Sequence, residues 1–191
     1  MELFEAIRSR RSVRDFDSKP VPDEILTQLI EAARWAPTGG NLQPWEFVIV
    51  KSQTQKERLV QATYAGYMAK TGKPQSWILK APVVVVACAN LGESEARYGD
   101  HGKDIAILDL AACIENFLLA AVAVGLGSCW VSGYDEARVR EILRLPNSVK
   151  PIGILPVGYP KMIPPPPPRL PVEDIVYYEE YMRNPVEAST S

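Results

Sequence analysis

Apolar side chains recur at helical spacing in several parts of this chain. Leu3, Phe4 and Ile7 form one such stripe, and a longer one begins after Asp23. Apolar positions three and four residues apart lie on one face of a helix, so this spacing predicts amphipathic helices. Helices are predicted over residues 2–8, from residue 23 onward, and over 54–68, 104–124 and 136–143.

Uninterrupted or short apolar runs predict the strands. Residues 82–87 are apolar throughout, which is typical of a strand covered on both faces. Residues 71–80 and 92–102 combine glycine with charged residues, and 71–80 also contains a proline, which favours loops. Further strands are predicted over residues 45–50, 128–131 and 152–157. Helices and strands therefore alternate along the chain, as in an α/β or α+β sandwich.

Two segments indicate a second subunit. The C-terminal half of the 104–124 helix is apolar nearly all round, so it must be buried at the centre or against another subunit. Five consecutive prolines, 164–168, should run as an extended polyproline segment. A disordered tail is the alternative, but solvent would leave its apolar and aromatic side chains unburied. We therefore expect residues 164–191 to wrap over a partner; the side chains concerned are Ile175, Val176, Tyr177, Tyr178 and Tyr181.

The composition is that of a globular protein with one core. The chain has 191 residues, of which 47% are hydrophobic and 23% charged. Its net charge of -2 gives no global attraction to nucleic acid or anionic lipid, so any anion site must be local. No apolar export segment begins the chain, and the apolar run at 117–126 is shorter than a membrane span of about 20 residues. We therefore expect a cytoplasmic protein with no membrane partner.

The three cysteines are predicted to be buried thiols. Cys88, Cys113 and Cys129 are odd in number, widely spaced and set among apolar neighbours. This arrangement suits a reducing compartment better than disulfides or a metal site. No metal is implied.

A cluster of cations follows the first predicted helix. Arg8, Arg10, Arg11 and Arg14 surround Ser12 in a chain that is slightly acidic overall. Guanidinium groups donate paired hydrogen bonds to phosphate oxygens, and a serine hydroxyl with neighbouring backbone N–H groups completes such a site. By itself, a short basic run is more often a solvated turn.

A second candidate site joins the second helix to the first strand. Gly39 and Gly40 allow a ligand to approach the backbone closely. The side-chain amides of Asn41 and Gln43 can donate and accept hydrogen bonds at the edge of a heterocycle. A helix stop followed by a proline-terminated loop would explain the glycines but not the two amides.

Together these two stretches resemble the N-terminal signature of the nitroreductase family. The combination is much more specific than either part, and the resemblance covers most of the chain except residues 65–102. It rests on residues 10–16, 32–38, 41–45, 125–127, 130–134, 154–160 and 169–171.

The resemblance implies a fold and an assembly. The expected fold is α+β, a nitroreductase-like three-layer sandwich whose central, mostly antiparallel sheet is flanked by helices, in an intertwined homodimer. Residues 1–163 would form the FMN-binding domain and residues 164–191 the proline-rich extension. FMN is the implied cofactor and NADH or NADPH the transient electron donor. The implied activity is ping-pong transfer of reducing equivalents to nitroaromatics, quinones or similar small acceptors.

The resemblance also assigns roles to residues. Arg10, Arg11 and Ser12 would bind the FMN phosphate and ribityl chain, and Arg169 would reach the same phosphate. Arg14 would face the pyrimidine edge of the flavin, where a fixed cation favours the anionic reduced form. No side chain is assigned a catalytic role, and His101 is expected to be solvated. The remaining residues expected at the flavin are Pro37, Thr38, Gly39, Asn41 and Gln43, and Val131, Ser132 and Gly133, whose backbone would pass the flavin N5.

Two alternatives remain open at this stage. One is a specialised family member, such as a reductive dehalogenase, a flavin-fragmenting enzyme or a heterocycle dehydrogenase. The other is a non-catalytic module that binds nucleic acid or a phosphopeptide through residues 8–14. The net negative charge and the lack of interleaved aromatic residues near this turn argue against it.

Overall fold

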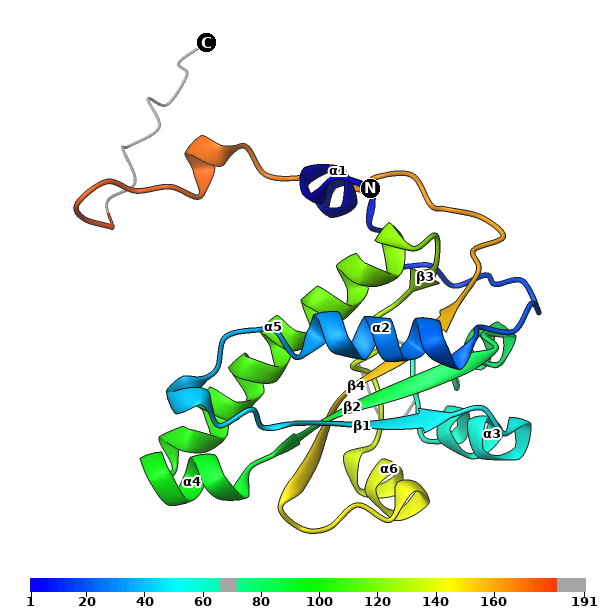
Figure 1. The fold of residues 1–191 in the computed structure, drawn as a ribbon, viewed down its shortest axis with the longest axis horizontal. Helices are drawn as coiled ribbons and strands as arrows, with labels where there is room; N and C mark the ends of the chain where they lie inside the picture. The colour runs from blue at the N-terminus through cyan, green and yellow to red at the C-terminus, as the bar shows by residue number, and fades with distance from the viewer. Residues whose placement is uncertain (66–71, 182–191) are drawn as a thin grey trace.

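A three-layer α+β sandwich is seen in the computed structural model, which describes residues 1–65 and 72–181 (Figure 1). Four strands form one sheet in the order β1-β2-β4-β3, and each neighbouring pair is antiparallel. The strands are β1 (Trp45–Val50), β2 (Val83–Asn90), β3 (Gly127–Ser128) and β4 (Val149–Gly158). The predicted α+β sandwich with a mostly antiparallel central sheet is thereby confirmed.

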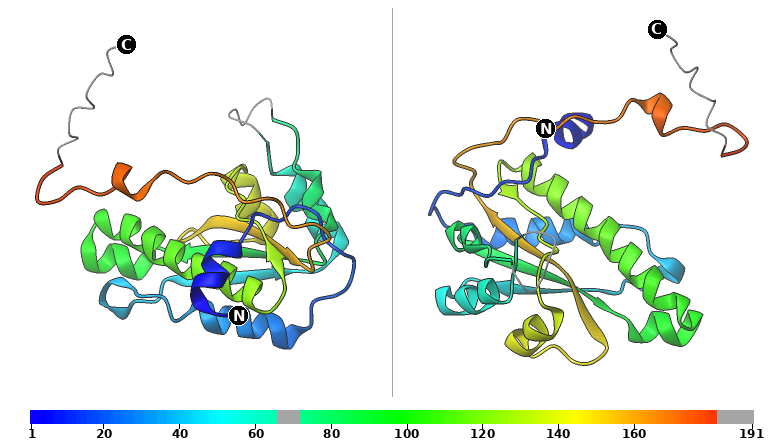
Figure 2. Two further views of the ribbon diagram at one scale, coloured as in Figure 1. Left: turned by 90° about the horizontal axis from the view of Figure 1, so that it is seen from above. Right: turned by 180° about the vertical axis from the view of Figure 1, so that it is seen from behind.

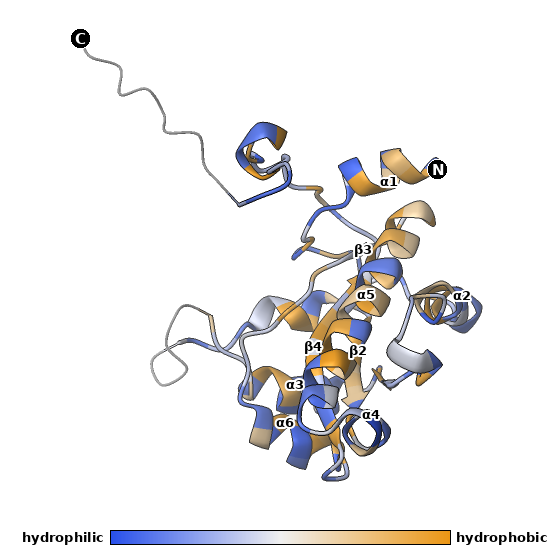
Figure 3. Cartoon of the chain, turned by 90° about the vertical axis from the view of Figure 1, so that its left-hand side faces the viewer, coloured by the Kyte–Doolittle hydropathy of each residue, from blue (hydrophilic) through white to orange (hydrophobic). Residues whose placement is uncertain are grey.

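Alternation along the central strand β2 builds a core on each face of the sheet. Val83, Val85 and Ala87 face one way, toward α2 (Asp23–Ala33) and α5 (His101–Ala123). Val84 and Val86 face the other way, toward α3 (Gln53–Gln61) and α6 (Glu136–Leu143). Successive side chains of a strand point to opposite faces, so an uninterrupted valine run fits a strand covered on both sides. Seen along the sheet, the helices lie in separate layers on its two sides (Figure 3).

Helix α5 is the central helix of one layer. By length and composition alone it could cross a membrane, since its most apolar window has a mean hydropathy of 2.0. In this fold it packs against α2 and the sheet, and its N-terminal part also meets α4 (Gly92–Tyr98). Leu108 nevertheless remains 66% exposed on its outer face. Buried residues of α5 are Gly102, Ala106, Leu110, Cys113, Ile114, Phe117, Leu118 and Ala121.

Some predicted elements are wrong in extent or type. Residues 92–102 were expected to form a loop, but they hold α4 and the start of α5, including His101. Glycine at 102 allows α5 to approach α4 closely, because an added Cβ there would lie 2.0 Å from the carbonyl oxygen of Ser94. This contact between helices is not visible in the local sequence.

Helix α3 is shorter than predicted. It ends at Gln61, and the carbonyl of Ala62 accepts a hydrogen bond from Asp135 N–H. The N–H of Tyr64 then donates to Gly133, so the backbone leaves the helix to pair with a distant segment. The end of the predicted helix at 66–68 lies outside the described residues. The predicted strand at 128–131 is also split, into β3 and an isolated bridge between Val131 and Ile154.

The chain ends run along one end of the sandwich. Helix α1 (Leu3–Ser9) and the tail lie beside the end of α5, and the tail then leads away from the sheet (Figures 1 and 2). Ile175, Tyr178 and Tyr181 are exposed in the single chain, as are Leu3 and Phe4 of α1. The only regular structure in the tail up to residue 181 is a single 3₁₀ turn, η3 (Val172–Asp174). The three cysteines are buried and free, as predicted.

Candidate functional site

The cation cluster and the tail form one pocket. We call it the arginine pocket; its volume is about 300 Å³, within the range of small-molecule sites. The structure therefore brings together residues predicted from two distant parts of the sequence. The pocket is lined by Arg10, Arg11, Ser12, Arg14, Pro164, Pro165, Pro167 and Arg169.

Strand β3 holds the arginine segment, residues 10–15, in place. The N–H of Val13 donates to the carbonyl of Ser128 at 2.9 Å, and Ser12 and Ser128 form a parallel bridge. Val13 is buried directly over Gly127, where an added Cβ would lie 2.7 Å from the Val13 Cγ2 atom. Burial of Val13 thus turns the neighbouring Ser12 and Arg14 toward the pocket.

The arginines of the pocket differ in their partners. Arg10 Nε lies 3.4 Å from Glu115 Oε1 on α5. Arg11 donates to the carbonyls of Arg8 and Arg10 at 2.7 and 2.8 Å, and its Nε is buried with no hydrogen-bond partner in the described chain. An unpaired buried donor is costly, so an anion that accepts from Arg11 Nε would relieve that cost. The pocket therefore fits a phosphate group.

Arg14 lines the same pocket with a different set of contacts. Its Nη1 donates to the carbonyl of Ser12 at 3.3 Å, and its guanidinium carbon lies 5.7 Å from the ring centroid of Trp77. Trp77 belongs to a 3₁₀ helix, η2 (Ser76–Lys80), within the region that showed no resemblance to any motif.

The pKa of the Cys129 thiol is affected by two of the same cations. Burial raises the pKa of its thiol, while the nearby Arg14 cation, a hydrogen bond with Ser12 and the Arg10 cation act in the opposite direction. Burial has the larger effect, so the thiol stays protonated at neutral pH and is not a nucleophile.

The glycine loop lies elsewhere in the single chain. The N–H of Gly39 donates to Asp109 Oδ2 on α5 at 3.0 Å. Asp109 and Glu115, the α5 partner of Arg10, lie about 9 Å apart along a helix axis. None of the predicted loop residues Pro37, Thr38, Gly39, Asn41 and Gln43 lines the arginine pocket.

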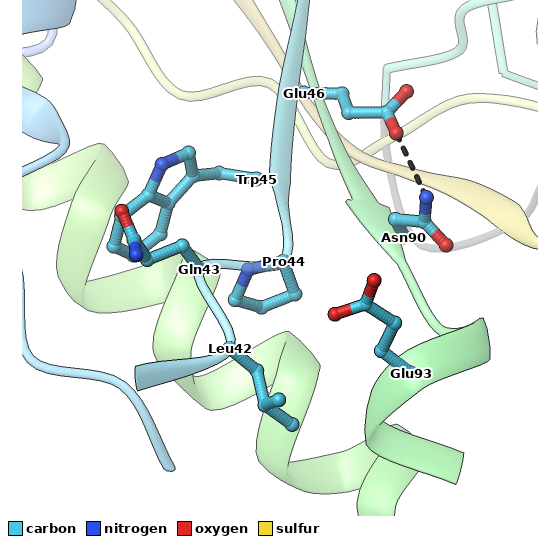
Figure 4. A pocket seen from close by; sticks show the side chains of 7 residues that line it. All are labelled: Leu42, Gln43, Pro44, Trp45, Glu46, Asn90 and Glu93. Carbon is cyan, nitrogen blue, oxygen red and sulfur yellow. Dashed lines mark hydrogen bonds between the residues drawn. The ribbon is translucent and has the colours of Figure 1, made fainter. Parts of the chain in front are cut away.

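Gln43 instead lines a small pocket of acidic character. Glu46 and Asn90 point toward one another there and are joined by a hydrogen bond of 2.9 Å, and Glu93 enters from α4 (Figure 4). Two carboxylates disfavour a phosphate, so this pocket is not a second anion site. The loop can serve a cofactor only if its free face meets another surface.

The backbone of the glycine loop is strained. Gly40 has a φ of 58°, as its lack of a Cβ allows, but Asn41 at 58° and Gln43 at 51° also occupy the left-handed region. Asparagine tolerates that conformation better than glutamine does. Strained residues tend to cluster at binding sites, which supports a functional role for this loop.

Gln43→Gly should therefore stabilise the ligand-free protein by about 1 kcal/mol, because glycine adopts a positive φ without steric cost. Urea unfolding of ligand-free protein measures the change. Gln53→Gly, which places glycine in the first turn of α3, should have the opposite sign. Equal destabilisation by both changes would show that the conformation of Gln43 carries no strain.

The third predicted segment is held by residues that sequence reasoning did not select. Gly133 accepts hydrogen bonds from Tyr64 N–H at 2.9 Å and from Gln75 Nε2 at 3.3 Å. Gln75 also donates to the carbonyl of Tyr64 at 3.0 Å, and Val131 is paired with Ile154. Gln75 directly precedes η2, so one short segment contacts both the 131–133 backbone and, through Trp77, Arg14. No motif marks Gln75, and only the folded chain shows its role.

Several known proteins are similar to this chain over most of its length. A model described as the nitroreductase family matches residues 7–159. A putative NADH dehydrogenase/NAD(P)H nitroreductase of Archaeoglobus fulgidus is 30% identical over 84% of this chain and 86% of its own length. The iodotyrosine deiodinase 1 of Rattus norvegicus is 30% identical over 83% of this chain and 62% of its own length. The solved structure of an NADPH:FMN oxidoreductase from Vibrio harveyi, complexed with NAD+, superposes with a TM-score of 0.82 at 26% identity, covering 95% of this chain and 79% of the other.

Proposed function

Because the chain belongs to the nitroreductase family of NAD(P)H oxidoreductases, we propose that it is an FMN-dependent enzyme acting in the cytoplasm. It passes reducing equivalents from NADH or NADPH to a nitroaromatic, a quinone or a similar small acceptor by a ping-pong mechanism. The observation that carries the proposal is the arginine pocket, a space of small-molecule size that an N-terminal segment and the tail line with cationic side chains. The name of the Vibrio harveyi relative, an NADPH:FMN oxidoreductase, supports the choice of cofactor.

The residues of the pocket fit the phosphate end of FMN. Arg10, Arg11 and Arg169 supply cationic donors, and Ser12 supplies a hydroxyl. A phosphate that reaches the unpaired Arg11 Nε would give it an acceptor. The glycine loop does not contribute in the same subunit.

The other end of the site is built for the ring system. Bound FMN supplies the hydride chemistry, and the protein supplies binding and electrostatics. Arg14 presents a cation that no carboxylate neutralises within residues 1–65 and 72–181. Gln75 and Tyr64 hold the backbone carbonyl of Gly133, within the segment proposed to pass the flavin N5.

The enzyme is proposed to work as an intertwined homodimer. The glycine loop of one subunit would then meet the arginine pocket of the other, which explains why the two groups lie apart in the single chain. The exposed apolar side chains of α1, the outer face of α5 and the tail support this assembly, because an interface would bury them. Residues 164–191 act as an extension of the 1–163 domain that wraps over the partner. Candidate interface residues are Leu3, Phe4, Ile7, Leu108, Leu170, Val172, Ile175, Val176, Tyr178 and Tyr181.

Removal of residues 170–191 should weaken the dimer while leaving each fold intact. The deletion keeps Arg169 but removes side chains such as Ile175 and Tyr178, which have no core contacts in the single chain. The dimer dissociation constant should rise by about tenfold or more, since buried aromatic anchors carry much of the affinity of an interface. Sedimentation velocity over a dilution series measures the change. A truncated chain that dimerises as tightly as the full chain would contradict the wrapping role of the tail.

The central proposal is tested by flavin binding and turnover. Purified protein is expected to bind FMN with flavin absorbance, and stopped flow should resolve reduction by NADH or NADPH from reoxidation by a quinone. Two separate half-reactions are the signature of ping-pong transfer. Protein that acquires no flavin absorbance after incubation with FMN would remove the central claim.

The second candidate is a specialised member of the family. The similarity to an iodotyrosine deiodinase at 30% identity favours a reductive dehalogenase among the possible specialised members, alongside flavin-fragmenting enzymes and heterocycle dehydrogenases. A panel of acceptors distinguishes the candidates. Reduced protein that reacts slowly with every quinone but rapidly with a halogenated phenol would favour the specialised activity.

A further inference from the structure

One short element, η2, contacts two neighbouring residues of the arginine segment with opposite chemistry. Trp77 places its ring near the Arg14 guanidinium, and Lys80 Nζ lies 2.9 Å from Asp15 Oδ1. A 3₁₀ helix has three residues per turn, so side chains three positions apart lie on the same face. Trp77 and Lys80 therefore meet the segment side by side.

The ring of Trp77 is a fixed platform. It is half-buried and packs against the cluster of Val13, Phe16 and Ala81, of which Val13 belongs to the arginine segment. The end of η2 is held in turn by the buried Lys56 of α3, whose Nζ donates to the carbonyl of Ala81 at 2.8 Å. The position of the indole ring is therefore set by packing, and the Arg14 guanidinium can contact the ring in only a limited range of orientations.

Helix η2 also keeps the charge of Arg14 from being neutralised by its neighbour Asp15. Asp15 is the nearest carboxylate in sequence, but Lys80 binds it, and this hydrogen bond lowers the pKa of the Asp15 carboxyl. Arg34 shows the contrasting arrangement, because it lies 5.6 Å from the ring centroid of Trp35 but is also bound by both carboxylate oxygens of Glu31. A ring attracts a cation without cancelling its charge, whereas a carboxylate cancels it.

We propose that Trp77 is a positioning residue for Arg14, holding its guanidinium in one orientation and un-neutralised toward the ring end of the cofactor. Lys80 contributes by keeping Asp15 away from Arg14. The inference rests on the proposed function, since it sets how strongly this site prefers reduced over oxidised FMN. Trp77 acts through Arg14 and is not itself a catalytic residue.

A double-mutant cycle tests the proposal in the full-length protein. Trp77→Leu keeps an apolar side chain without a π face, and it should lower the preference for reduced over oxidised FMN about fivefold. In an Arg14→Gln background the same substitution should have no effect on that preference, because the cation it positions is absent. Trp77→Phe should retain most of the wild-type preference. Anaerobic titrations with oxidised and reduced FMN, together with the midpoint potential, give the ratio.

Trp35→Leu is the matched control, since it removes the ring of the other tryptophan–arginine pair and should leave the preference unchanged. The inference would be overturned if Trp77→Leu left the preference for reduced over oxidised FMN unchanged while Arg14→Gln lowered it. The proposed function would still stand in that case. An equal loss in both backgrounds would also overturn it, because Trp77 would then act without Arg14.

A flavin-free measurement separates the two proposals. In the apoprotein, the indole ring current should shift the side-chain proton resonances of Arg14, and Trp77→Leu should abolish that shift in a chain whose melting curve shows it to be folded. If the protein binds no FMN, the proposed function fails. The ring-current shift still tests whether Trp77 and Arg14 are in contact, because it is measured without flavin. Absence of the ring-current shift in the wild-type chain would overturn the inference.

Discussion

Replacing Arg10 with alanine is expected to weaken FMN binding about 100-fold, because the change removes a cation from the phosphate end and exposes a carboxylate at once. Arg10 Nε lies 3.4 Å from Glu115 Oε1, so the pair enters the arginine pocket as a partly neutralised unit. Without Arg10, the carboxylate of Glu115 repels the phosphate that the pocket should hold. Fluorescence titration of the apoprotein with FMN measures the dissociation constant.

Two further variants separate local from general charge effects. Arg8→Ala removes a cation two residues away that does not line the pocket, and it should change the dissociation constant less than about threefold. Adding Glu115→Gln to Arg10→Ala should recover about tenfold of the lost affinity. If Arg8→Ala and Arg10→Ala weaken binding equally, FMN senses only the net charge of the region.

The parts of the fold that the sequence predicted well are those governed by local pattern. The valine run of β2 and the long apolar helix α5 are recognisable from their own composition, and both exist as predicted, although β2 extends to Asn90 and α5 begins at His101. The nitroreductase resemblance, confirmed by the family model, rested on combining segments that are weak alone. The structure adds a physical reason for one such combination: Arg169 lines the same pocket as Arg10.

The parts that could not be predicted depend on contacts between distant segments. Helix α4 was predicted to be a loop because of the glycines at its ends. In the fold it packs on α5, where Gly102 lies against Ser94. Gln75 and Trp77 lie in a region without any motif, and their roles arise from Gly133 and Arg14, far along the chain. Periodicity and motifs describe one segment at a time, so they cannot reveal a residue whose function is to hold two others.

The second large effect is expected at Gly127, which lies outside the arginine pocket but supports it. In Gly127→Ala the new methyl group would lie 2.7 Å from Val13 Cγ2 and 2.9 Å from Val13 Cβ. Neither atom is the end of a flexible side chain, so the arginine segment must shift. We expect a loss of about 2 kcal/mol in the free energy of unfolding, typical of overpacking, and about tenfold weaker FMN binding. Urea unfolding and FMN titration measure the two effects.

The position of the arginine segment can be separated from simple stability. Gly125→Ala forces alanine into a φ of 79° but meets no atom within 4 Å, so it should cost about 1 kcal/mol without weakening FMN binding. Val13→Gly in the Gly127→Ala chain removes both contacting atoms, Cγ2 and Cβ, while leaving the core underpacked, so FMN affinity should return although stability does not. If affinity instead follows the free energy of unfolding across all three variants, β3 contributes rigidity alone. Recovery of affinity without recovery of stability would show that Gly127 sets where Ser12 and Arg14 stand.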